Sequence, residues 1–265
     1  MKKRLISICI VLILIALLCI VFTSCGSAKV ARFGRHSSID VAKKLESEGF
    51  EVGIVDEDSL LSVYVNMGDN SLATISTDSM EPTLSKGDVI IAKTFDGNIS
   101  KLKVGQIVTF KAQIRIGNAY YESFNTHRII QIRSNGTIVT RGDNQNAKDG
   151  NDWKNYTEST VGTQSETIAP SDVVAVWGDI DRENSFVQGE IIKNVGDIDW
   201  IVTVGSKYYS NNQQVAIFKY TSNKKAKESY DSLKVIINSN DVIYGEKVVI
   251  CGKNDYINDI IDIKL

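Results

Sequence analysis

Five short apolar runs between residues 88 and 178 most constrain how this chain can fold. They read DVIIAKTF, QIVTFKA, HRIIQIR, TIVTRG and DVVAVWG, and polar or glycine-containing turns separate them. Runs of this length that are rich in Val and Ile indicate strands rather than helices. We therefore predict a mainly β body over residues 72–182.

The segments on either side of this body mix helices with strands. In residues 37–68, Ser37 and Asp40 form a capping signal ahead of an apolar helical face. In residues 196–265, Ser222 precedes another helical pattern, and strand-like runs surround it. Each segment is small for an independent core. We predict that the two pack together as one small α+β unit, with the β body inserted between them.

The N-terminus carries an uncharged apolar run, Leu5–Phe22, directly after three basic residues. The run is nearly long enough to span a bilayer as a helix, and the basic residues favour an exported body. Two interpretations stay open for residues 1–25. They form a transmembrane anchor, or FTSC is a lipoprotein cleavage box whose Cys25 then carries lipid. Both place the folded part outside the cell, tethered to the lipid of the cell membrane.

Composition excludes several classes of function. The net charge is −2, so no basic field would draw the chain to nucleic acid. The four cysteines form no CxxC pair and no Cys/His cluster, which argues against a metal site. The glycine motifs that bind phosphates are also missing from the sequence. We therefore expect no cofactor and no metal.

The candidate for chemistry is the stretch STDSMEPTL, in which Ser79 stands just before a proline turn. His127, one of two histidines, heads an apolar strand, and Asp143 and Asp149 follow in a polar loop. A serine hydrolase needs a nucleophile, a base to take its proton and a carboxylate to orient that base. From composition alone, an ordinary turn serine and a structural histidine are the better interpretations, because Ser, Asp and one His occur by chance in most domains.

The order and wording of the motifs are more informative. SMEPTLSKGDVIIAK, LKVGQIVTF, THRII, TRGDN and DVVAVWG together resemble the type I signal peptidases, over residues 72–180. The resemblance is to the histidine-type branch of the endoplasmic reticulum, archaea and some Gram-positive bacteria. It implies a signal-peptidase-like β fold with Ser79 as nucleophile and His127 as general base.

The same resemblance implies further roles. Asp149 is the favoured orienting carboxylate and Asp143 a supporting one, with the reverse assignment left open. The Thr77 hydroxyl would help the backbone N–H of Ser79 to stabilise the oxyanion. Met80 and Pro82 would shape the turn and take part in binding the substrate.

The implied function is a membrane-tethered serine endopeptidase that cuts signal peptides or similar exported segments after small residues. Its substrate would be an exported preprotein. Activity should fall below about pH 6–7, where a histidine base becomes protonated. The alternative is a catalytically inactive surface lipoprotein that binds peptides or envelope components.

Overall fold

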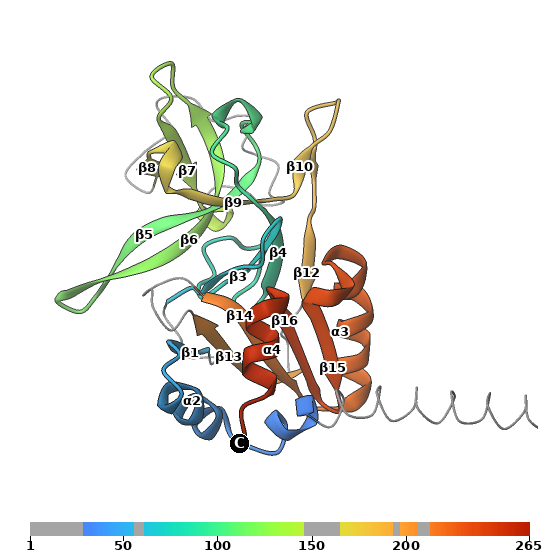
Figure 1. Ribbon diagram of the computed structural model, residues 1–265. Coiled ribbons are helices and arrows are strands. Elements are labelled where there is room, and N and C mark those ends of the chain that lie inside the picture. The colour runs from blue at the N-terminus through green and yellow to red at the C-terminus, as the bar shows by residue number, and fades with distance from the viewer. Residues whose placement is uncertain (1–28, 56–60, 146–164, 193–196, 206–212) are drawn as a thin grey trace, which may run out of the picture.

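The computed structural model describes residues 29–55, 61–145, 165–192, 197–205 and 213–265. Within these ranges the protein is mostly β-sheet with few helices (Figure 1). No helix in the described ranges is long and apolar enough to cross a membrane. The predicted N-terminal anchor or lipoprotein signal, with Cys25, lies outside the described residues.

One mixed sheet of fourteen strands runs through the molecule, with a main path in the order β1-β13-β14-β2-β3-β4-β9-β5-β6-β7-β8. Its strands are β1 (Val52–Val55), β2 (Tyr64–Asn66), β3 (Asn70–Thr74), β4 (Val89–Thr94), β5 (Ile107–Ile116), β6 (Ala119–Ile132), β7 (Ile138–Arg141), β8 (Glu166–Ile168), β9 (Val173–Trp177), β12 (Glu190–Ile192), β13 (Ile198–Gly205), β14 (Gln213–Tyr220), β15 (Val242–Gly245) and β16 (Val248–Gly252). A separate ribbon pairs β10 (Asp179–Ile180) with β11 (Phe186–Val187). Three α-helices have both ends within the described ranges, α2 (Ser38–Ser47), α3 (Asn223–Ile236) and α4 (Asn254–Ile261), and residues 29–33 are also helical.

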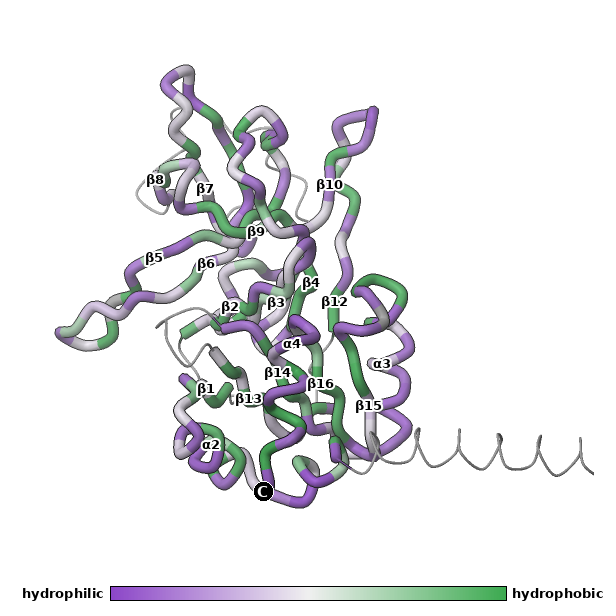
Figure 2. Tube along the Cα trace, in the orientation of Figure 1, coloured by the Kyte–Doolittle hydropathy of each residue, from purple (hydrophilic) through white to green (hydrophobic). Residues whose placement is uncertain are grey.

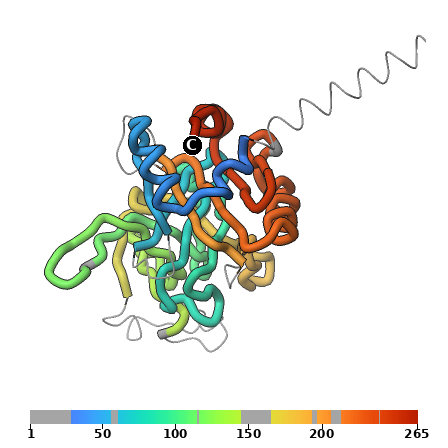
Figure 3. Tube along the Cα trace, turned by 90° about the horizontal axis from the view of Figure 1, so that it is seen from below, coloured from blue at the N-terminus to red at the C-terminus, as the bar shows by residue number. Residues whose placement is uncertain are grey.

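The β body contains a strand within each of the five predicted runs, which confirms that part of the prediction. Its described core has three apolar clusters, one around Ile90 and Trp177, one around Phe110 and Ile129, and a small one of Ile130, Val139 and Ile180. The sequence predicted only the second half of β6. That strand begins earlier, at Ala119, and forms with β5 a long hairpin that projects from the body (Figures 1 and 3).

The α+β unit is a sheet covered by helices on both faces. Alternate residues of β14 point to opposite sides: Ala216 and Phe218 pack in the cluster that includes α3, whereas Val215 and Ile217 pack in the cluster that includes α2 and α4. Figure 2 shows the strands of this unit as predominantly hydrophobic. The expected caps are present, because the Ser37 and Ser222 hydroxyls accept backbone N–H groups at the starts of α2 and α3.

The two flanking segments meet in this unit. β1 pairs antiparallel with β13, and α2 packs against both strands. β2, placed in the same segment by the sequence, pairs instead with β3 of the body and makes a short parallel contact with β14 at Val65 and Gln213. Because the edge of one part pairs with the edge of the other, the body and the unit share a continuous sheet.

Candidate active site

Ser79 lies in a tight turn that is anchored from inside the body. The backbone N–H groups of Thr83 and Leu84 donate to the Met80 carbonyl, at 2.9 and 3.0 Å. Met80 and Leu84 have no exposed surface and pack in the cluster around Trp177. In this structure Met80 is therefore an anchor of the turn rather than a surface that meets a substrate. Pro82 is exposed, and its bond to the preceding residue is cis.

The structure brings Ser79 against His127. The distance from Ser79 Oγ to His127 Nε2 is 3.1 Å. The Thr77 hydroxyl donates to Ser79 Oγ at 3.0 Å and accepts the backbone N–H of Ser79 at 3.4 Å. His127 is only 6% exposed, and the Phe110 ring packs near it in a tilted arrangement. Three side chains that the sequence singled out thus form one contact group, which extends from Thr77 to His127.

The other nitrogen of His127 faces a carboxylate that the sequence analysis missed. Glu166 Oε2 lies 3.0 Å from His127 Nδ1. Glu166 is the first residue of β8, and the Asn125 side-chain amide lies 3.0 Å from both of its carboxylate oxygens. We call Thr77, Ser79, Asn125, His127 and Glu166 the Ser79 network. Nothing in the sequence distinguishes Glu166, near the end of a long polar stretch, from other surface acids.

Asp143 occupies a different place from the one expected of an orienting carboxylate. Its oxygens accept Arg128 Nε at 2.8 Å and Nη2 at 2.6 Å, and the Thr83 hydroxyl at 2.5 Å. Both members of the ion pair are almost fully buried. Asp143 therefore holds Arg128 and the turn at Thr83 and does not contact His127, which corrects the alternative that it orients the base. Asp149 lies outside the described residues.

The segment around Asp143 also fixes the nucleophile turn directly. The Asn144 backbone N–H donates to the Ser79 carbonyl at 3.0 Å, and its side-chain amide donates to the Asp78 carbonyl at 2.9 Å. A Cβ on Gly142 would lie 2.4 Å from the Ser79 carbonyl oxygen and 3.2 Å from His127 Nε2. Glycine is required at this position because any side chain would collide with the backbone of the nucleophile.

The charged groups of the described residues do not point to a metal. Within the described ranges, no cluster of three or more His, Cys, Asp or Glu side chains is arranged to hold a metal ion. The Ser79 network has one imidazole and one carboxylate, and both contact polar groups of the protein. The arrangement can move a proton from a hydroxyl to an imidazole without any added group.

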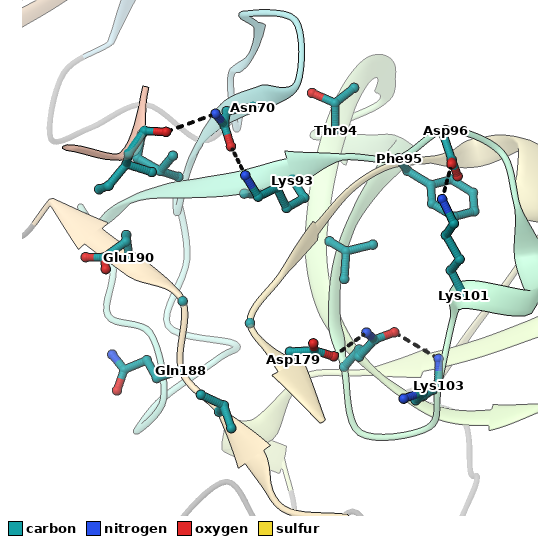
Figure 4. Close-up of a pocket in the computed structure, with 18 residues that line it drawn as sticks. Asn70, Lys93, Thr94, Phe95, Asp96, Lys101, Lys103, Asp179, Gln188 and Glu190 are labelled. Atoms are coloured by element: carbon teal, nitrogen blue, oxygen red, sulfur yellow. Dashed lines mark hydrogen bonds and ion pairs between the residues drawn. The ribbon is translucent and has the colours of Figure 1, made fainter. Parts of the chain in front are cut away.

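A pocket of about 780 Å³ opens elsewhere, between β4, the loop after it and β12 (Figure 4). Its polar side chains largely contact one another: Lys93 donates to Asn70 at 2.9 Å, and Lys101 pairs with Asp96. This pairing with Lys101 lowers the pKa of Asp96. No member of the Ser79 network lines the pocket. The pocket therefore offers none of the chemistry that Ser79 and His127 offer.

Comparison with known proteins agrees with this location of the site. Residues 59–186, just under half of the chain, match the family model described as signal peptidase, peptidase S26. The matched range contains every member of the Ser79 network and most of the β body. No curated protein and no solved structure matches the chain. The central part of the chain is thus similar to peptidases of the S26 family, and this similarity supports an activity of the signal-peptidase kind.

Proposed function

We propose that this chain is a membrane-tethered serine endopeptidase of the histidine type, which cleaves exported segments after small residues. The observation that carries the proposal is the 3.1 Å distance between Ser79 Oγ and His127 Nε2, in a region that matches the S26 model. A serine hydroxyl is a weak nucleophile at neutral pH, and a neutral imidazole at this distance makes it competent.

The chemistry follows from the contacts around Ser79. Its Oγ attacks the scissile carbonyl carbon while His127 Nε2 takes the hydroxyl proton. The negative oxygen that develops would be met by the backbone N–H of Ser79 and by the Thr77 hydroxyl. His127 then gives its proton to the departing amine, which leaves an ester on Ser79. Water, activated by the same imidazole, hydrolyses this ester.

The substrate would bind as an extended strand whose alternate side chains enter shallow pockets. If the substrate strand pairs with the edge of β6, Ser62 already occupies one end of that edge. Ser62 forms an antiparallel bridge with Phe124 of β6, and its hydroxyl lies 2.8 Å from that of Ser76. A substrate strand would therefore pair with the part of β6 between Phe124 and His127, or it would displace Ser62. The N-terminal apolar run would hold the protein at the membrane where exported segments emerge.

The test is cleavage of a model preprotein by the full chain in detergent, compared with Ser79→Ala. Ser76→Ala is the matched control, since it removes a neighbouring hydroxyl that contacts Ser62 rather than His127. We expect Ser79→Ala to abolish cleavage and Ser76→Ala to retain it. Equal cleavage by all three proteins would reject Ser79 as nucleophile. No cleavage by any of them, with binding of the same peptide retained, would favour the inactive peptide-binding lipoprotein.

A further inference from the structure

We infer that Glu166 is the carboxylate that positions His127. In the sequence, a long polar stretch separates it from Asp143. This inference rests on the proposed function, and it replaces the aspartates favoured by sequence. Glu166 reaches the imidazole from β8, which pairs with β7 through Thr140, and β7 pairs in turn with β6. Beyond the end of β7 the chain continues with Gly142, whose lack of a side chain leaves the space beside His127 open.

The contacts of the imidazole favour one of its two tautomers. The Thr77 hydroxyl donates to Ser79 Oγ, so the Ser79 hydroxyl is free to donate to Nε2 of His127. With the Ser79 hydroxyl as donor, Nε2 is the unprotonated nitrogen and Nδ1 carries the proton. That proton points at Glu166 Oε2, 3.0 Å away. Glu166 therefore stabilises the one tautomer in which His127 can act as a base toward Ser79.

Asn125 holds the carboxylate in place. Its side-chain amide donates toward both oxygens of Glu166 at 3.0 Å, while its own carbonyl oxygen accepts the backbone N–H of Thr126 at 2.9 Å. The Glu166 side chain is 39% exposed, whereas that of His127 is only 8% exposed. A half-exposed carboxylate needs such a clamp to keep a single orientation toward the ring.

The other candidate carboxylate is committed to different partners. Asp143 binds Arg128 and Thr83, as described above. In the part of the chain that the structure describes, Glu166 is the carboxylate that lies within hydrogen-bond distance of His127. Asp149, outside that part, is the competing assignment, and the experiment below separates the two.

The experiment reads the tautomer of His127 directly, through the ¹⁵N signals of its imidazole in the full chain in detergent at neutral pH. The chain has only two histidines, so His36→Gln assigns the signals without ambiguity. We expect the wild-type protein to show protonated Nδ1 and unprotonated Nε2. Glu166→Ala should lose this preference, and Asp149→Ala should keep it. Glu190→Ala is the control, because Glu190 also begins a short strand but lines the remote pocket.

Cleavage of the model preprotein provides the second measurement. Glu166→Gln removes the charge that stabilises the imidazolium and presents an amide N–H to Nδ1, so we expect the cleavage rate to fall about 100-fold or more and the preference for protonated Nδ1 to be lost. A wild-type spectrum with protonated Nε2, or a preference lost in Asp149→Ala and kept in Glu166→Ala, would overturn the inference. The expected tautomers without any wild-type cleavage would instead reject the proposed function while leaving the Glu166–His127 pairing intact.

Discussion

The β body and the α+β unit have interiors of different kinds. Among the described residues, twelve of the buried polar or charged side chains lie between Ser71 and Asp143, and only Thr203 and Gln214 lie in the α+β unit. The body buries an ion pair and an imidazole, whereas the unit buries apolar side chains on both faces of its strands. The part that carries the candidate chemistry is therefore the part with the polar core.

This difference has an energetic consequence. A buried charge is tolerated only while its partner is present, since removing one member leaves the other uncompensated in a dry environment. An apolar core stabilises in proportion to the area it buries and has no such dependence on a single partner. The body should accordingly be sensitive to single polar substitutions, and the unit should depend on packing.

The largest effect on stability is expected for Asp143→Asn. The change leaves the buried Arg128 without its counter-charge, and the free energy of unfolding should fall by about 3–5 kcal/mol. Denaturant unfolding followed by tryptophan fluorescence would measure the loss. Asp262→Asn is the control, because its partner Lys29 is exposed and such a surface pair contributes about 0–1 kcal/mol. A loss as small as that of the control would show that the buried pair of Arg128 and Asp143 does not dominate the stability of the β body.

The same measurement tests whether the two parts unfold together. With Trp153 replaced by Phe, the remaining reporters are Trp177 in the body and Trp200 in the α+β unit, and replacing each in turn isolates the other. Because the strands of both parts belong to one sheet, we expect both probes to report the same shifted transition in Asp143→Asn. A shift confined to Trp177 would separate the body from the unit.

The next effect in size concerns activity alone. Thr77→Val keeps the shape of the side chain but removes the hydroxyl beside the Ser79 N–H, so the cleavage rate should fall about 100-fold to 1,000-fold. Stability should be unchanged, because Thr77 is exposed. The control is Thr167→Val, because Thr167 is also an exposed threonine but lies in β8. The measurement compares kcat/KM of the two variants. Equal values would remove Thr77 from the oxyanion site.

The smallest effect is confined to alkaline pH and to the unit. Complete burial raises the pKa of the Cys251 thiol from 9.0 to about 12. The unfolded chain releases this proton at lower pH, so the stabilisation is present below about pH 9 and is lost as the pH rises toward 12. Free energies of unfolding across this interval should decline less steeply for Cys251→Ala than for wild type. Parallel curves would mean that the thiol ionises equally easily in both states.

Local signals predicted much of the fold. The serines at 37 and 222 marked helix starts because capping is a contact within one turn of chain. The projecting half of β6 was missed, since residues such as Glu122 and Asn125 interrupt the apolar pattern and the segment is held by its pairing with β5. The membrane anchor, the lipid on Cys25 and the role of Asp149 remain predictions.

The sequence by itself determined the β body and the two serine-capped helices of the α+β unit, because short motifs and periodic patterns encode them, and its resemblance to a peptidase family pointed to the pair of Ser79 and His127. Only the tertiary structure shows which carboxylate of the described residues contacts the base. Asp143 is close to His127 in the sequence and is named by a motif, yet it turns to Arg128. Glu166 is 39 positions away and reaches His127 because β6, β7 and β8 lie side by side. Strand pairing brings distant residues together, and no local pattern records that contact.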